Sequence, residues 1–311
     1  MLRLCFAITL ATLPAAAQER VIYGGGDPAV STYSGVMVPH IVEQFQGAGI
    51  TAYEWSGPTS GTGQNIAEIE FNPYGFAVGQ SDAVLSAIEG GAPLRVYFTN
   101  IGPECFHVIS KDGMTFEEAV AQNAPIHVGG ELSGTAFSVR NLLTEGYGKE
   151  LSAINLVYEP ATSAAAGGVG VFVQRPDPAA RVYRDRADQG FRFSGIGSID
   201  AELAGYTPLN VTIKDSGVVL GIGAEEQTFN TTCMTTVVFG YDPSKMEEGS
   251  RERRYMETLV LPKISTLYPH QMVPPAEGNW LNVAVEAINA AGSSAQAAGG
   301  SILDRLNDLQ Y

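Results

Sequence analysis

The sequence contains little that could hold a metal ion or cross a membrane. Its three cysteines and four histidines are scattered, without the close spacing of a metal site, so we expect no metal and no cofactor. After the first residues no run of about 18 apolar residues occurs, and we expect no direct membrane insertion. Basic residues are also scarce. Because 18 lysines and arginines face 33 acidic residues, the net charge of −15 disfavours nucleic acid as a partner.

The rest of the composition is that of a well-packed globular protein. Hydrophobic residues make up 45% of the chain and charged residues only 16%, which excludes an intrinsically disordered protein. Without a leader of the kind described next, about 290 residues remain, the size at which a single core stops growing and two lobes become expected.

The first residues resemble a secretory signal peptide. Arg3 precedes an apolar segment from Leu4 to Leu13, and the small residues from Ala15 to Ala17 form a cleavage pattern. We therefore expect residues 1–17 to be removed and the protein to be exported to the periplasm. A retained membrane anchor is the alternative, and the small residues at the end of the segment argue against it.

Two cysteines remain once Cys5 has left with the signal peptide. In an oxidising compartment Cys105 and Cys233 can form a disulfide, and closing so long a loop contributes about 4–5 kcal/mol in the chain-entropy model. The alternative is a pair of buried free thiols that pack as small apolar residues.

Segments with strand and helix patterns alternate along the chain, which predicts an α/β fold. The expected strands are 21–23, 50–55, 75–78, 94–98, 106–110, 126–128, 155–158, 169–174, 191–196, 209–213 and 232–241. The expected helices are 36–45, 65–71, 83–89, 115–121, 136–143, 251–267, 280–290 and 301–309.

The alternating pattern restarts after a bend at Gly102 and Pro103, which predicts a second lobe. We expect lobe I to comprise residues 18–107 and 229–311, and lobe II to comprise residues 108–228. A chain that leaves one lobe, builds another and returns places two strands at a hinge, a geometry that fits closure around a ligand.

Two turns rich in glycine and hydroxyl residues each follow a strand and open a helix. They are residues 57–65 and 129–135. Such a turn leaves unpaired backbone N–H groups at a helix N-terminus, where the dipole favours an anion and small side chains let it come close. Two such turns in one chain predict a ligand held between two lobes.

The order of four motifs resembles that of TAXI-type solute-binding proteins of tripartite ATP-independent periplasmic (TRAP) transporters. Gly-Gly with Ser31 to Tyr33 comes first, followed by Gly61 to Asn65, Gly79 to Asp82 and Gly129 to Thr135. The match covers the N-terminal half through these motifs and the C-terminal half only through the order of elements.

This resemblance implies a type II periplasmic binding protein fold, with two α/β lobes, a central ligand cleft and two hinge-crossing strands. It also implies a receptor, expected to be a monomer and not an enzyme, that hands a small carboxylate-bearing solute to membrane transporter subunits. Such a solute would be an amino acid or a dicarboxylate. The residues that the resemblance places around the ligand are Tyr33, Thr62, Asn65, Gln80, Ser81, Ser133 and Thr135.

A carboxylate solute usually requires an arginine partner, and two arginines are candidates. Arg140 follows the second turn at helical spacing, and Arg95 lies on a strand before the bend. We expect Arg140 to contribute to the site. The stretch from Ala164 to Gly170 lacks the acidic residue that the family usually has there, which leaves the identity of the solute open.

Other functions remain open at this point. A binding protein of an ATP-driven importer for a phosphate- or sulfonate-like anion shares the fold and the Ser-Gly-Thr turn, and a periplasmic ligand-sensing adaptor would use the same lobes. A secreted serine hydrolase would need Ser60 or Ser133, yet neither stands in Gly-x-Ser-x-Gly. The segment from Gly24 to Ala29 fits a dinucleotide fingerprint, but Asp27 and Pro28 are unsuited to a pyrophosphate.

Overall fold

The structure is a computed structural model that describes residues 19–26, 31, 33–175, 181–197, 206–213 and 227–272. The expected signal peptide (1–17) and the expected helices 280–290 and 301–309 lie outside these residues. Within the described part of the chain, no helix has both the length and the hydrophobicity that crossing a membrane requires.

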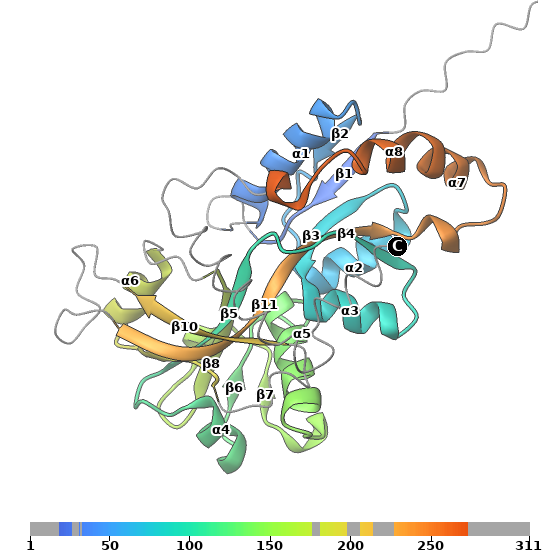
Figure 1. Ribbon diagram of the computed structural model, residues 1–311. Coiled ribbons are helices and arrows are strands. Elements are labelled where there is room, and N and C mark those ends of the chain that lie inside the picture. The colour runs from blue at the N-terminus through green and yellow to red at the C-terminus, as the bar shows by residue number, and fades with distance from the viewer. Residues whose placement is uncertain are drawn as a thin grey trace, which may run out of the picture.

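Lobe I is built on a mixed sheet with the strand order β2-β1-β3-β11-β4. Strand β1 (Arg20–Tyr23) runs parallel to β2 (Ala52–Glu54) and to β3 (Phe76–Gln80). Strand β11 (Gln227–Tyr241) runs antiparallel to β3 on one side and to β4 (Leu94–Phe98) on the other. Parallel strands need helical crossovers, and the helices between them complete an α/β lobe (Figure 1).

Helices cover both faces of this sheet because the strands are apolar on both sides. In β1, Ile22 joins the cluster under α1, whereas Val21 joins the cluster under α2 and α3. Helix α1 buries Val38 and Phe45 in the first cluster, on one face of the helix. The helical segments of lobe I are η1 (Tyr33–Met37), α1 (Val38–Gly47), α2 (Thr62–Phe71), α3 (Ser81–Glu89), η5 (Pro243–Lys245), α7 (Arg251–Tyr255), η6 (Met256–Val260), α8 (Leu261–Ile264) and η7 (Pro269–Met272).

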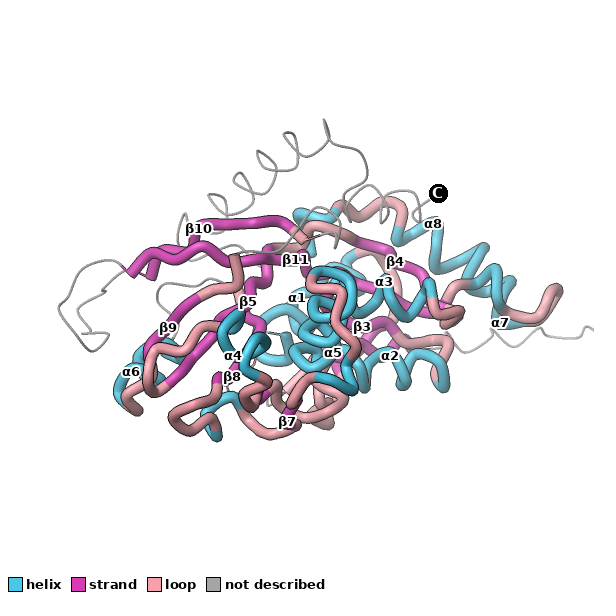
Figure 2. Tube along the Cα trace, turned by 90° about the horizontal axis from the view of Figure 1, so that it is seen from below, coloured by secondary structure: helices cyan, strands magenta, loops and turns pink. Residues whose placement is uncertain are grey.

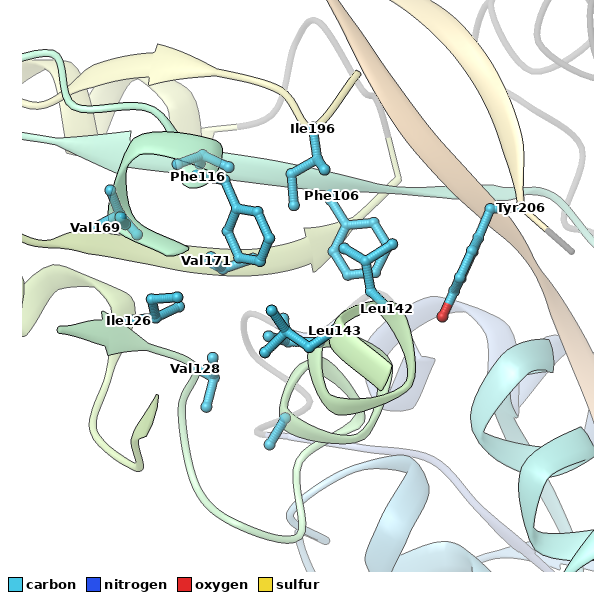
Figure 3. Packing of buried hydrophobic residues seen from close by; sticks show 14 of the residues in the cluster. Phe106, Phe116, Ile126, Val128, Leu142, Leu143, Val169, Val171, Ile196 and Tyr206 are labelled. Atoms are coloured by element: carbon cyan, nitrogen blue, oxygen red, sulfur yellow. The ribbon is translucent and has the colours of Figure 1, made fainter. Parts of the chain in front are cut away.

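Lobe II contains a second mixed sheet with the order β11-β5-β8-β6-β7, to which β10 adds beside β11 and β9 beside β5. Figure 3 shows its main core, where Phe106, Phe116 and Leu142 come together from a strand and two helical segments. The strands are β5 (Pro103–Ser110), β6 (Ile126–His127), β7 (Leu156–Val157), β8 (Val169–Gln174), β9 (Arg192–Ser194) and β10 (Thr207–Ile213), and the helical segments are α4 (Phe116–Gln122), α5 (Gly134–Asn141), η2 (Leu142–Gly146), η3 (Leu151–Ala153), η4 (Ala161–Ser163) and α6 (Arg181–Asp188).

Strand β11 runs through both lobes. Its 15 residues pair with β10 and β5 in lobe II and then with β3 and β4 in lobe I. Figures 1 and 2 both show β11 extending from β10 in lobe II to β4 in lobe I. The second crossing is the link from β4 to β5. These features give the expected type II arrangement of two α/β lobes joined by two crossing strands.

The two sheets meet between Gly102 and Pro103 on one crossing strand and between Thr235 and Thr236 on the other. These positions lie a few residues from the boundaries expected at 107/108 and 228/229. The first position coincides with the bend that the sequence predicts at Gly102 and Pro103. On the other crossing strand the sequence pattern does not mark the change, because β11 continues through the boundary without a break.

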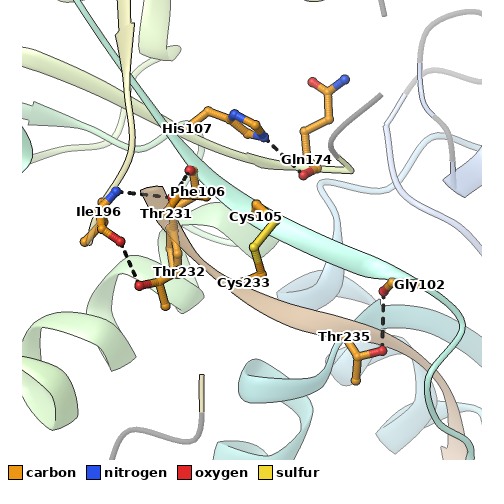
Figure 4. The surroundings of a disulfide bond; sticks show 10 residues. All are labelled: Gly102, Cys105, Phe106, His107, Gln174, Ile196, Thr231, Thr232, Cys233 and Thr235. Carbon is orange, nitrogen blue, oxygen red and sulfur yellow. Dashed lines mark hydrogen bonds between the residues drawn. A yellow bond between two sulfur atoms is a disulfide. The ribbon is translucent and has the colours of Figure 1, made fainter. Parts of the chain in front are cut away.

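Cys105 and Cys233 are joined by a disulfide. They face each other in the ladder between β5 and β11, so the bond links the two crossing strands beside the sheet boundary (Figure 4). Both residues are fully buried. Of the two alternatives for this cysteine pair, the structure shows the disulfide.

Candidate functional site

Three glycine turns meet where the two lobes touch. A Cβ atom on Gly25 would lie 3.1 Å from the Cα of Gly61, and one on Gly61 would lie 3.1 Å from the backbone N of Gly134. Gly25 follows β1 and Gly61 precedes α2 in lobe I, whereas Gly134 begins α5 in lobe II. We call this meeting point of the three turns the seam. The two hydroxyl-glycine turns singled out in the sequence therefore lie against each other from opposite lobes.

Gln80 crosses the seam from the end of β3. Its backbone N donates to the Thr62 hydroxyl at 3.2 Å, and its Oε1 accepts from the same hydroxyl at 2.7 Å. The carboxamide lies so close to Gly134 that a Cβ there would overlap with Oε1. Gln80 and Thr62, two of the residues expected at the ligand, thus lie together next to the N-terminus of α5.

Asn65 is fully buried, and its amide is occupied within lobe I. Its Nδ2 donates to the carbonyls of Gly24 and of Val78, the latter at 3.0 Å, and its Oδ1 accepts from the Thr59 hydroxyl at 2.8 Å. These bonds tie the ends of β1 and β3 to the turn before α2. The side-chain amide of Asn65 therefore makes its hydrogen bonds to groups of lobe I.

The hydroxyls of Ser81, Ser133 and Thr135 also have protein partners. Ser81 Oγ accepts from the backbone N of Thr235 at 3.3 Å, which connects α3 to a crossing strand. Ser133 caps α5, since its Oγ accepts from the backbone N of Ala136 at 3.1 Å and donates to the Val128 carbonyl at 3.2 Å. Thr135 Oγ1 accepts from a β8 backbone N at 3.1 Å.

A carboxylate on a crossing strand adds a charge to this region. Glu104 of β5 is only 3% exposed and accepts from the Thr236 hydroxyl of β11 at 3.0 Å. The hydroxyl of Tyr33, a residue expected at the ligand, lies beside this carboxylate, and it is buried without a well-formed hydrogen bond. Burial raises the pKa of Glu104, while Tyr33, Arg175 and the hydrogen bonds of Thr236 and Gln80 oppose the rise.

Arg175 supplies the opposite charge from lobe II. It directly follows β8, is 6% exposed, and donates from Nη2 to the Ile101 carbonyl at 2.8 Å. Its guanidinium packs on Gly102, where a Cβ would lie 2.9 Å from Nη2. Its Nε is buried and has no hydrogen-bond partner among the residues that the structure describes. Burial lowers the pKa of Arg175, and Glu104 and Tyr33 counteract this effect.

Glu104 and Arg175 attract each other without direct contact. In the described part of the chain no ion pair joins them, although each lies within the electrostatic range of the other. Two buried charges are costly to desolvate, and a direct contact normally offsets part of that cost. Because Glu104 and Arg175 are not in direct contact, their attraction offsets only part of this desolvation cost.

The two arginines considered from the sequence lie elsewhere. The guanidinium of Arg140 stacks on the ring of Phe137 at 4.3 Å, and that ring in turn packs against Gly63 of lobe I. Arg95 pairs with Gly240 toward the far end of β4, away from the crossing point near Thr236. Arg175 is the arginine that is buried beside Glu104.

Sequence reasoning missed Glu104 and Arg175, and a positional signal for Arg175 was present. In α/β sheets ligands bind beyond the carboxyl ends of strands, and Arg175 is the residue that directly follows the expected strand 169–174. Glu104 carries no such signal, because it adjoins the bend and only the pairing of β5 with β11 buries it.

A second polar contact holds the lobes together. Asp82, at the start of α3 in lobe I, accepts from Ser138 of α5 at 2.9 Å and from the Tyr206 hydroxyl at 2.9 Å. The side chain of Asn141 donates to the Asp82 carbonyl at 3.3 Å. Burial raises the pKa of Asp82 to about 6, although both hydroxyls act to lower it.

The described residues give the hydrolase alternative no pairing of Ser133 with a histidine base. Both hydrogen bonds of the Ser133 hydroxyl go to backbone groups next to α5. His127, which lies nearest to it in sequence, faces Glu159 at 3.7 Å instead. Within the described residues, no group of three or more histidine, cysteine or acidic side chains is placed to hold a metal ion.

Comparison with known proteins gives weak similarities. No protein-family model matches the sequence, and no curated protein matches it. Among solved structures, the GluR0 ligand-binding core from Nostoc punctiforme, in complex with L-glutamate, is 12% identical with a TM-score of 0.41, over 86% of this chain and 96% of that one. A binding protein component of an ABC phosphonate transporter from Pseudomonas aeruginosa is 10% identical with a TM-score of 0.38, over 94% of each chain. An ABC transporter periplasmic substrate-binding protein from Coxiella burnetii is 14% identical with a TM-score of 0.34, over 79% and 94%.

Proposed function

We propose that the protein is an exported solute receptor that binds a small carboxylate-bearing solute at the seam and delivers it to a TRAP-type membrane transporter without changing it chemically. The observation that carries the proposal is Arg175. This residue is buried where the two lobes meet, and its Nε has no partner in the described part of the chain, so a carboxylate oxygen would satisfy it.

The residues around the seam divide into two groups in this proposal. Asn65, Ser81 and Ser133 hold the turns, because the hydrogen bonds of their side chains go to the protein itself. The residues proposed to contact the solute or to lie beside it are Tyr33, Thr62, Gln80, Glu104, Thr135, Arg140 and Arg175.

The residues proposed to contact the solute come from both lobes, which explains why binding would close them. Thr62 and Gln80 belong to lobe I, Arg175 and Thr135 belong to lobe II, and Glu104 lies on a crossing strand. A solute that touches both lobes makes all its contacts only when they are closed, so binding shifts the population toward the closed state.

Replacement of Arg175 tests the proposed site. The mature chain is screened by thermal shift and by calorimetry against carboxylates, amino acids and phosphate. For any solute that binds, Arg175→Gln is expected to weaken affinity by roughly 10- to 100-fold, because a hydrogen bond between charged groups is lost.

Two further variants make this test specific. Arg192→Ala removes an exposed arginine of the same lobe and is expected to leave affinity unchanged. Arg140→Ala measures how much Arg140, the other arginine proposed at the site, contributes to affinity. If no solute of any class binds, or if Arg175→Gln binds as tightly as the unchanged protein, the proposed site is wrong.

The membrane partner is proposed from the motifs of the N-terminal half alone. An ATP-driven importer is equally compatible with a two-lobe receptor. Reconstituting the loaded receptor with the permease encoded beside it separates the two, because a TRAP-type transporter runs on an ion gradient whereas an importer of the second kind requires ATP. Uptake that depends on ATP would replace the TRAP partner and leave the receptor function intact.

A further inference from the structure

Two opposite charges lie beside the seam without forming an ion pair. Glu104 and Arg175 are both more than nine-tenths buried, and they come from a crossing strand and from lobe II. Their hydrogen-bond partners are neutral, namely the side chains of Thr236 and Gln80 for Glu104 and the Ile101 carbonyl for Arg175. None of these contacts neutralises a charge.

Two buried polar atoms next to these charges lack good hydrogen bonds. Among the described residues the Nε of Arg175 has no hydrogen-bond partner, and the hydroxyl of Tyr33 lies beside Glu104 without a well-formed hydrogen bond. Tyr33 acts electrostatically on Arg175 as well as on Glu104, so the three side chains form one group. Buried polar atoms without partners are uncommon in folded proteins and mark places where a ligand or water completes the bonding.

A ligand that completes this group needs two different ends. The free N–H of Arg175 requires an acceptor, and a carboxylate matches its charge. Glu104 accepts hydrogen bonds from neutral side chains, and an ammonium group would match its charge in the same way. A second carboxylate would instead stand near Glu104 and be repelled by it.

We propose that the seam selects zwitterionic solutes of the α-amino acid type, with the carboxylate on Arg175 and the amino group on Glu104 and Tyr33. Dicarboxylates, which the sequence left equally open, are disfavoured. This inference rests on the proposed function, because it names the class of solute that the same site would take.

The test compares ligands that share a carbon skeleton and differ only at the amino position. Calorimetry on the mature chain measures L-alanine, L-lactate and propionate as one set, and L-glutamate, 2-hydroxyglutarate and glutarate as another. At least one amino acid is expected to bind, and to bind roughly tenfold or more tightly than its deaminated partners, as expected for a lost charged hydrogen bond.

The variant Glu104→Gln tests the origin of this preference. It keeps the shape of the side chain and removes its charge, so the preference for the amino acid is expected to shrink to a few-fold while the dependence on Arg175 remains. Tyr33→Phe provides a milder second change, since it removes only one of the proposed partners of the amino group.

The outcomes separate this inference from the proposed function. If a dicarboxylate or phosphate binds the unchanged protein as tightly as any amino acid and depends on Arg175, the receptor stands and the selection for zwitterions is wrong. An amino acid preference that survives in Glu104→Gln also overturns it. The ligand comparison needs no variant, so it decides the question even if Glu104→Gln fails to fold. If nothing binds, both proposals fall.

Discussion

At the scale of single residues, the interface between the lobes is held by buried polar side chains. Asp82 illustrates the cost, because its carboxylate is buried and exchanges water for two hydroxyl donors and the backbone N–H of Ala83. Burial favours the neutral form of such a group, so its ionisation lowers the free energy of unfolding.

The stability contributed by Asp82 should therefore depend on pH. The folded pKa of about 6 lies above the ordinary value of 3.8, so the contribution is complete below about pH 4 and is lost as the pH rises through about 6. Between these limits the free energy of unfolding of the unchanged protein should fall by up to about 3 kcal/mol relative to Asp82→Asn.

Urea unfolding of both proteins across this pH range provides the measurement. Glu131→Gln changes an exposed carboxyl and serves as the control. A difference between Asp82→Asn and the unchanged protein that stays constant with pH would show that Asp82 is not held in the way described.

At the scale of elements, the site is assembled from strand ends and helix starts. The start of α5 is the closest example, since Gly134 lies directly against the Gln80 carboxamide from the end of β3. Glycine is needed here for close approach and not for its backbone angles.

Gly134→Ala is expected to disturb this contact. The added methyl group overlaps with Gln80, which must leave Thr62 or push α5 away, and such overpacking costs about 1–3 kcal/mol of unfolding free energy. Gly130→Ala is the matched control, because it lies in the same turn with open space around its Cβ position. Urea unfolding measures the stability of both variants. Equal stability would contradict the prediction, because it would mean that Gln80 moves away from the added methyl group without a loss of free energy.

The same scale shows what could be predicted from the sequence. Among the described residues, the alternation of apolar patterns predicted the strands of both lobes and most of their helices, but it missed α6. The two hydroxyl-glycine turns were expected in opposite lobes, and they lie against each other. The extent of β11 was underestimated, since it begins at Gln227 and not near Thr232. The polar and hydroxyl residues between these points conceal a strand that pairs with β10 and β5 on its two sides.

The charged pair was missed for a related reason. Glu104 and Arg175 are distant in sequence. Neither residue belongs to a sequence motif that would indicate its contact with the other. The antiparallel pairing of β5 with β8 places Cys105 opposite Gln174, and this register brings their neighbours Glu104 and Arg175 together. Such a pairing is a property of tertiary structure, which local patterns do not encode.

At the scale of the whole molecule, two lobes with separate cores share two strands. The apolar clusters under α1 and under α2 and α3 belong to lobe I, and the cluster in Figure 3 belongs to lobe II. Each core can persist while the crossing strands twist, which is the geometry that hinge closure requires.

Removing the disulfide should lower stability without abolishing the fold. The double variant Cys105→Ser and Cys233→Ser is expected to lose about 4–5 kcal/mol of unfolding free energy in the chain-entropy model, because its unfolded chain regains the freedom of a long loop. Guanidinium unfolding of this variant and of the oxidised protein measures the loss. Equal midpoints and slopes for the two proteins would contradict it.

The position of the disulfide also changes what a protease can do to this protein. Lobe II begins just before Cys105 and ends just after Cys233, so the bond (Figure 4) closes nearly the whole lobe into a covalent ring that is connected to lobe I through two adjacent strands. A single cut in any loop of that ring leaves one molecule, with the two crossing strands still fastened side by side. Only reduction, or a second cut, can release a fragment of lobe II.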